Sequence, residues 1–354
     1  MSEIINERDS LWRKELRNKI SAKERSLITR VHMNEEDSSV RNKSNVEVNK
    51  GLSEEQALVE AKRCLDCPVP TCMKGCPVEI DIPGFIKCVE NKDYKLAIDT
   101  IKKSSSLPAV CGRVCPQEKQ CEEQCVYFTN MKKEAVAIGY LERFVADYDR
   151  VNGKPEIPSI KKNGIKVAVV GSGPAGLSFA NDMSRFGYDV TVFEALHQVG
   201  GVLKYGIPEF RLPNDVIDHE INLLRKQGIK FETNVIVGKT ITFDELQKEG
   251  FKGFFIGSGA GLPKFMNIPG ENLVGICSSN EYLTRINLMG AGRPSYDTPI
   301  FRGQTVAIIG GGNTALDSAR TAVRQGAKRT VIIYRRSLEE MPAREEEVRH
   351  AKEE

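Results

Sequence analysis

The chain has 354 residues, of which 40% are hydrophobic and 28% charged, and its formal net charge is +3. This length allows two or three domains, and a charge so close to neutral argues against a nucleic-acid partner. No apolar run in the sequence approaches the roughly 18 residues of a membrane span, and the charged N-terminus lacks the apolar core of a signal peptide. We therefore expect a cytoplasmic protein.

Residues 1–50 are predicted to be a polar extension with one or two helices, in which Glu35–Asn49 is a loop. Ser53 and Gln56 have the spacing of a capping box. They are expected to start a helix that runs into Arg63 and delivers the first cysteine.

Two further helices are predicted in the first 150 residues. Helical spacing over Ile82–Ile101, with Pro83 in the first turn, predicts one of them. The second is predicted over residues 134–148. We interpret residues 51–150 as a helical domain with cysteine loops between its helices.

Nine of the ten cysteines lie in this domain. Since nothing indicates secretion, clustered cysteines favour metal binding over disulfides. The two groups are Cys64-x2-Cys67-x4-Cys72-x3-Cys76-Pro77, and Cys111-x3-Cys115-Pro116 followed by Cys121-x3-Cys125.

These spacings resemble a ferredoxin run, which ends in Cys-Pro and gives its fourth cysteine to the other cluster. Structural zinc is the alternative, but only Cys64 and Cys67 have the two-residue spacing of a zinc knuckle. We therefore favour two iron–sulfur clusters. Cys88 falls inside a predicted helix, and both it and Cys277 are expected to be buried thiols.

Residues 151–164 are rich in Pro and Gly and are interpreted as a linker. Two βαβ units follow. In the first, strands are predicted at Lys166–Val170 and Asp189–Phe193. In the second, strands are predicted at Thr305–Ile309 and Thr330–Tyr334, with a helix between them that ends at Gly326. Each unit has a glycine loop between its first strand and its helix.

The first loop has the spacing of a dinucleotide fingerprint. Its glycines permit a tight turn and the close approach of a pyrophosphate to a helix N-terminus. Glu194 ends the next strand, where an acid accepts hydrogen bonds from ribose hydroxyls. The loop residues are Gly171, Ser172, Gly173, Pro174, Ala175 and Gly176.

The second loop differs at the end of its second strand, which runs into Arg335 and Arg336 instead of an acid. Arginines there can bind a 2′-phosphate, so this site is expected to prefer NADPH over NADH. A solvated basic strand end is the alternative. The loop residues are Gly310, Gly311, Gly312, Asn313 and Thr314. Tandem sites predict a flavin that is reduced by a nicotinamide.

The chain resembles the small subunit of NADPH-dependent glutamate synthase and its relatives. These relatives include the N-terminal half of dihydropyrimidine dehydrogenase and the large subunit of NADH-dependent ferredoxin:NADP oxidoreductase. The resemblance runs from about Val31 to the last residue. It rests on CLDCPVPTCMKGCPVEIDIPGFI, CGRVCPQEKQCEEQC, AIGYLERF, VVGSGPAGL, GGVLKYGIPEFRLP, GSGAGLPKF and IIGGGNTALDSAR.

The resemblance implies an α/β chain in which a helical domain with two [4Fe–4S] clusters precedes tandem Rossmann-like domains. One cluster would be held by Cys64, Cys67, Cys72 and Cys125, and the other by Cys76, Cys115, Cys121 and Glu142. Cys111 would be left without a cluster. FAD would bind the first loop together with Glu194, Gly200, Gly201, Gly206 and Arg211. NADPH would bind the second loop with Arg335 and Arg336.

The implied domains are the extension (1–50), the iron–sulfur domain (51–150), the first part of an FAD domain (160–300) and the start of an NADPH domain (301–354). Since the family continues beyond this point, we expect the chain to be truncated, and possession of the fold does not ensure activity. The expected route runs from NADPH through FAD and the clusters to a partner.

In glutamate synthase that partner is an FMN subunit that makes glutamate. A role in electron bifurcation with ferredoxin and a zinc-stabilised nucleotide-binding scaffold without redox activity are the alternatives.

Overall fold

The computed structural model describes residues 7–153 and 159–354, so part of the predicted linker lies outside the described residues. Backbone contacts divide the chain into two units. Unit 1 comprises Met1–Glu35 and Asn49–Glu156, and unit 2 comprises Glu36–Val48 and Ile157–Glu354. The described helices are too short or too polar to cross a lipid bilayer.

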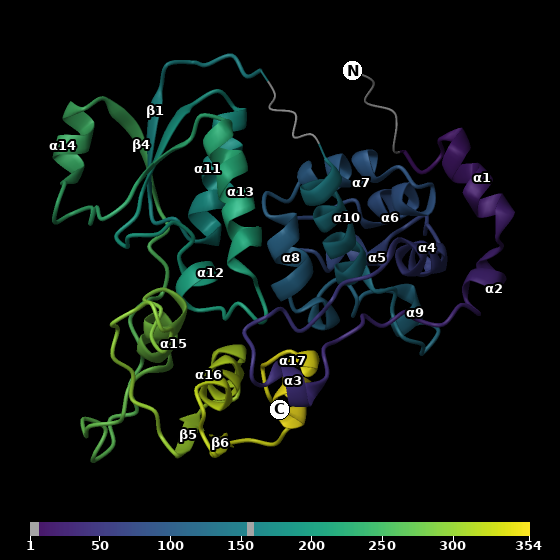
Figure 1. Cartoon of the computed structure of the whole chain (residues 1–354). Helices are drawn as coiled ribbons and strands as arrows, with labels where there is room; N and C mark the ends of the chain where they lie inside the picture. Colours follow the sequence, from purple (N-terminus) through teal and green to yellow (C-terminus); the bar gives the residue numbers. More distant parts are fainter. Residues whose placement is uncertain (1–6, 154–158) are drawn as a thin grey trace. The chain divides into compact units, whose positions relative to one another are not determined.

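Unit 1 is helical. Its core is formed by side chains that are almost completely buried, including Phe85, Ile86, Ile98, Ile101 and Leu141. The helices are α1 (Leu11–Lys19), α2 (Ala22–Arg25), α4 (Glu54–Arg63), α5 (Thr71–Lys74), α6 (Ile82–Glu90), α7 (Tyr94–Lys102), α8 (Pro108–Val114), the 3-10 turn η1 (Gln117–Lys119), α9 (Val126–Thr129) and α10 (Ile138–Asn152) (Figure 1).

The predicted start of α4 is confirmed, since Ser53 and Gln56 form a reciprocal capping box. The single helix predicted over Ile82–Ile101 is wrong. The chain forms α6 and α7 instead, because Lys92 takes a left-handed conformation (φ 61°) and the Asp93 side chain accepts from Leu96 N to cap a new helix. Helix α10 begins and ends four residues later than the range 134–148.

Helices α8 and α10 pack closely because Gly112 has no side chain. A Cβ at Gly112 would lie 2.6 Å from the backbone nitrogen of Arg143. This close approach places the end of α8, where Cys115 lies, against the first turns of α10, which carry Glu142.

Unit 2 holds two parallel sheets. The larger has the order β3-β2-β1-β4. The smaller pairs β5 with β6 (Figure 1). The strands are β1 (Lys166–Val170), β2 (Asp189–Phe193), β3 (Lys230–Glu232), β4 (Phe251–Ile256), β5 (Thr305–Ile309) and β6 (Arg329–Ile333). The predictions for β1, β2 and β5 are confirmed to the residue, and β6 begins and ends one residue earlier than predicted.

The helices of unit 2 include one in the segment 35–49, which was predicted to be a loop. Asp37 accepts from Ser39 N and starts this short helix. The helices are α3 (Ser38–Arg41), α11 (Pro174–Arg185), α12 (Val202–Tyr205), α13 (Asn214–Lys226), α14 (Phe243–Lys248), α15 (Ser279–Asn287), α16 (Asn313–Arg324) and α17 (Glu345–Glu353).

The two sheets differ in burial. In the larger sheet, Ala168 of β1 packs with Phe193, Leu246 and Phe251 in a buried cluster. In the smaller sheet, α16 covers one face through Ala315 and Ala319, while Ile309 and Ile333 stay exposed.

Candidate functional site

The first cysteine group is built on the end of α4. Cys64 caps this helix, and its N–H donates to Ala61 O. Asp66 then turns the chain with a left-handed φ of 52°. Its carboxylate is fully buried and pairs with Arg13 and Arg17 of α1. The loop between Cys64 and Cys67 is therefore tied to the N-terminal helix.

Four thiols of the predicted first ligand set line one pocket. These residues are Cys64, Cys67, Cys72 and Cys125, which come from the end of α4, the following loop, α5 and the start of α9. The rest of the wall is mostly apolar and includes Ile82, Pro83 and Ile86 of α6 together with Tyr127, Val136 and Ile138.

Burial changes the chemistry of these thiols. Desolvation raises the pKa of Cys64 to about 11 and also raises the pKa of Cys67. The pKa of Cys72 is raised by burial and then by the neighbouring Cys64, Cys125 and Cys67. Four thiolates cannot stay together in this pocket without a compensating cation, and a metal centre supplies one. The residues therefore fit an iron–sulfur cluster.

The second predicted ligand set contains three thiols and a carboxylate. Cys115 caps the end of α8, and Cys121 is buried. Burial raises the pKa of Cys121, and the neighbouring Glu122, Glu142 and Cys76 raise it further. Glu142 and Cys76 are therefore close enough to Cys121 to affect it electrostatically.

Glu142 lies on α10 and is 7% exposed. Its Oε1 atom is buried and has no hydrogen-bond partner within the described part of the chain. Burial, and to a smaller extent the nearby Cys111, raises the pKa of this carboxyl well above its usual range. A buried carboxyl oxygen without a donor is costly unless something binds it, so Glu142 fits a metal ligand. Cys111 lies beside it on α8.

Two predictions about the remaining cysteines have different outcomes. Cys88 is buried in α6, as expected. The prediction for Cys277 is wrong, since this thiol is exposed in the loop before α15. The neighbouring Val274 and Ile276 are exposed as well, so this stretch of the loop does not pack into a core.

The first glycine loop is hydrogen-bonded to Glu194, the acid at the end of β2. Glu194 accepts hydrogen bonds from Ser172 N (2.9 Å), Ser172 Oγ (2.5 Å) and Leu196 N (2.9 Å). Ser172 Oγ in turn accepts from Gly200 N at 2.9 Å. Gly201 lies so close to Gly173 that an added Cβ would be 2.7 Å from its Cα.

The structure thus brings together most of the predicted flavin residues. The loop ends at the N-terminus of α11, for which Gly173 is the N-cap, and Pro174, Ala175 and Gly176 form the first turn. Gly206 lies at the end of α12. A helix N-terminus with a flanking ribose-binding acid suits a dinucleotide.

The predicted flavin residue Arg211 pairs with acids of two helices outside this loop. It is buried and pairs with Asp317 of α16 (2.6 Å) and with Glu347 of α17 (2.8 Å). Glu347 also pairs with Arg320, which donates to Glu354. The sequence analysis did not predict this network. The only signal for it is the spacing of Asp317 and Arg320 on one face of a helix.

The second glycine loop caps α16 through Gly312, and Gly310 N donates to Ile333 O. The chain after β6 returns to this loop. Ala343 N donates to Gly311 O, and Arg344 N donates to Asn313 Oδ1 at 3.0 Å. Thr314 follows in the first turn of α16. Arg335 and Arg336 are exposed just beyond β6.

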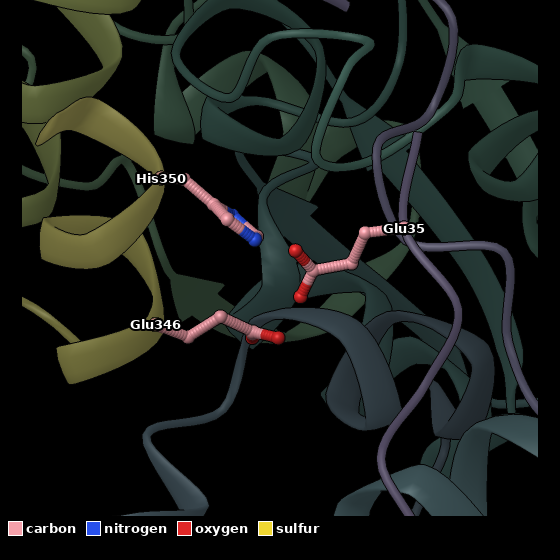
Figure 2. Close-up of side chains that lie close together, drawn as sticks. All are labelled: Glu35, Glu346 and His350. Carbon is pink, nitrogen blue, oxygen red and sulfur yellow. The ribbon is translucent and has the colours of Figure 1, made fainter. Parts of the chain in front are cut away.

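Helix α17 carries Glu346 and His350 one turn apart, and Figure 2 shows both side chains. The third side chain labelled there, Glu35, belongs to unit 1. No ligand site is assigned to these three residues.

Two family models match the chain. Residues 41–154 match dihydropyrimidine dehydrogenase domain II, 4Fe-4S cluster, and residues 165–354 match pyridine nucleotide-disulphide oxidoreductase. The expected fold class, a helical iron–sulfur domain followed by Rossmann-like nucleotide-binding domains, is confirmed. The expected cofactor classes are confirmed with it and are [4Fe–4S] clusters, FAD and a nicotinamide nucleotide.

Curated relatives match over most of this chain. The chain is 37% identical to the glutamate synthase [NADPH] small chain of Escherichia coli (strain K12), covering 87% of this chain and 66% of that protein. It is 35% identical to the corresponding protein of Azospirillum brasilense, and the match covers 86% of this chain and 64% of that protein. It is 38% identical to the NAD-dependent dihydropyrimidine dehydrogenase subunit PreT of Escherichia coli O157:H7, covering 84% and 69%.

The chain thus spans about two thirds of the length of these relatives. The iron–sulfur match covers the residues of both cysteine groups, and the oxidoreductase match covers both glycine loops. The chain belongs to the pyridine nucleotide-disulphide oxidoreductase family.

Proposed function

We propose that this chain is the electron-input part of an iron–sulfur flavoprotein, most similar in role to a glutamate synthase small chain. Electrons would enter from NADPH at the second glycine loop and pass through FAD at the first loop. They would leave through two [4Fe–4S] clusters in unit 1. When bound, the flavin converts the two-electron chemistry of the nicotinamide into single-electron transfer to the clusters.

The observation that carries this proposal is the gathering of the four thiols Cys64, Cys67, Cys72 and Cys125 around one pocket. A zinc-stabilised scaffold would also use four thiols. However, the second set contains Glu142 with an oxygen that no described residue satisfies, and the region matches a 4Fe-4S cluster model. Both observations favour iron–sulfur clusters.

The residues of unit 2 would bind and orient the two nucleotides. Glu194 is already held in place by Ser172 and Leu196, so it can accept from ribose hydroxyls without first being ordered. Gly173 and Gly312 leave space for a pyrophosphate at the N-termini of α11 and α16. Arg335 and Arg336 would bind the 2′-phosphate that distinguishes NADPH from NADH.

The electron acceptor is proposed from the relatives. Those with the name glutamate synthase small chain suggest the other subunit of a glutamate synthase as the partner. The resemblance to this family implies that such a partner contains FMN and forms glutamate. The relative named as a dihydropyrimidine dehydrogenase subunit suggests a different acceptor with the same electron-input part. Co-purification with a glutamate synthase large subunit, followed by an assay for NADPH-dependent glutamate formation, would distinguish them.

The first experiment is anaerobic purification followed by measurement of iron, zinc and flavin per chain. Two [4Fe–4S] clusters predict about eight irons per chain, and a working flavin site predicts one FAD. NADPH should then reduce an artificial dye. Zinc without iron would overturn the redox proposal.

A matched pair of cysteine variants tests the ligand assignment. Cys72→Ser should lower the iron content by about half, because one of the two clusters loses a ligand. Cys277→Ser should leave the iron content unchanged, because this thiol is exposed and lies outside both groups. Equal iron in the two variants would refute the assignment of Cys72.

A further inference from the structure

A buried lysine lies directly behind the first cysteine pocket. Lys87 is on α6 and is 0% exposed. Its Nζ donates to the carbonyl oxygen of Cys64 at 2.6 Å and to Glu90 Oε2 at 2.5 Å. The preceding residue, Ile86, lines the pocket with the four thiols. The ammonium group is therefore fixed to the backbone of a predicted cluster ligand.

Glu90 neutralises the positive charge of Lys87 only in part, because it also pairs with a second cation. Glu90 also receives both guanidinium nitrogens of Arg25, at 2.9 and 2.8 Å. The side chains of Lys87, Arg25 and Glu90 are all nearly inaccessible to solvent. Two buried cations thus face one buried carboxylate, which leaves one net positive charge at this position.

Asp66, a buried acid two residues after Cys64, does not reverse this balance. Asp66 is paired with Arg13 and Arg17, so its negative charge is already matched. A positive charge in a poorly solvated environment acts on nearby groups more strongly than a surface charge, because water screens it less.

Reduction of an iron–sulfur cluster adds one negative charge, and the net charge around a cluster is one of the factors that set its potential. We propose that Lys87 is a positioning residue that raises the reduction potential of the cluster at Cys64, Cys67, Cys72 and Cys125. This cluster is therefore reduced more readily when the positive charge of Lys87 is present than when that charge is removed. The inference rests on the proposed function, since it requires that a cluster occupies this pocket.

The test is a redox titration of the anaerobic full chain, followed by electron paramagnetic resonance of both clusters. Lys87→Gln removes the charge but keeps a group that can donate to Cys64 O, and Arg25 still neutralises Glu90. At a fixed potential, the ratio of reduced to oxidised first cluster should fall about tenfold, which corresponds to a drop of about 59 mV for a one-electron couple. The second cluster should not shift.

Two further variants separate charge from structure. Lys87→Arg keeps the charge and should restore the ratio found in the unmodified chain. Lys95→Gln is the matched control, because Lys95 is an exposed lysine of α7 that pairs with Asp99, and its loss should leave both potentials unchanged.

Glu90→Gln tests for a shift of the reduction potential in the opposite direction. It also provides a test if Lys87→Gln does not assemble an iron–sulfur cluster. Removing this carboxylate leaves the two cations without their shared partner, so the first cluster should become easier to reduce. An unchanged or lower potential in Glu90→Gln, or an unchanged potential in an iron-loaded Lys87→Gln, would overturn the inference. Absence of any cluster signal in the unmodified chain would instead overturn the proposed function.

Discussion

The two glycine loops of unit 2 share a backbone design but differ in what the protein places beside them. At the first loop, Glu194 is bonded to Ser172 and occupies the end of β2. At the second, Arg335 and Arg336 follow β6 and are exposed. Because each loop ends at a helix N-terminus, we expect the difference in charge at the strand end to decide which nucleotide each loop prefers.

The loops also differ in how firmly they are supported. The first stands on a four-stranded sheet with a buried β1. The second stands on two strands whose last residues, Ile309 and Ile333, are about half exposed. Side chains outside the sheet therefore matter more for the second loop, and the buried ion pairs of α16 are the main candidates.

The largest effect on stability is expected for Arg211→Ala. This change leaves Asp317 and Glu347 buried with one cation fewer, and unpairing a buried charge costs about 3–5 kcal/mol. Thermal unfolding of unit 2 should shift to a lower temperature, and nicotinamide binding should weaken because α16 carries the second loop. The control is Arg293→Ala, which breaks a more exposed ion pair with Glu209. Equal unfolding temperatures for the two variants would contradict the structural role of Arg211.

The next largest loss of stability is expected for Gly176→Ala. A Cβ there would lie 2.0 Å from the carbonyl oxygen of Gly171, so the first turn of α11 must move. Overpacking of this kind costs about 1–3 kcal/mol. Lower thermal stability and loss of bound flavin are the expected readouts.

Gly173→Ala is the matched comparison, because a Cβ at Gly173 meets nothing within 4 Å and the residue has an ordinary φ of −69°. Its unfolding temperature, compared with that of the unmodified chain without FAD, should be unchanged while FAD binding is lost. Gly312→Ala should behave in the same way toward NADPH, since its nearest neighbour would be Pro342 Cγ at 3.9 Å. Full flavin content in Gly173→Ala would show that no pyrophosphate approaches this residue.

A similar loss of stability is expected for Glu194→Ala. The change removes the acceptor for Ser172 and Leu196 and leaves the buried donors of Ser172 without a partner, which costs about 2 kcal/mol. Flavin content should fall as well. If Ser172→Ala lowers stability but retains FAD, the carboxylate and not the loop itself binds the ribose.

The smallest effect on stability is expected for the double change Arg335→Ala and Arg336→Ala, because substitutions of exposed residues usually change stability by less than about 0.5 kcal/mol. The dissociation constant for NADPH should rise about tenfold, which corresponds to about 1.4 kcal/mol, while that for NADH should change little. A parallel loss of both nucleotides would argue against a 2′-phosphate site and favour a solvated basic strand end.

Local sequence signals predicted several elements accurately. Apolar runs that lead into a glycine loop predicted β1 and β5, and the apolar run that ends in Glu194 predicted β2. The Ser53–Gln56 pair predicted the start of α4. The break between α6 and α7 was missed, because the helical spacing continues across Lys92 although the backbone does not.

The sequence by itself determined the order of the modules, the two cysteine groups and the two nucleotide loops, since each is a local pattern whose chemistry depends on spacing. Tertiary structure alone decided which side chains meet across long stretches of chain. It paired Arg211 with Asp317 and Glu347, left Cys277 exposed, and placed Lys87 against Cys64. Burial, which sets the strength of these charges, arises only when distant segments pack, and no local spacing encodes it.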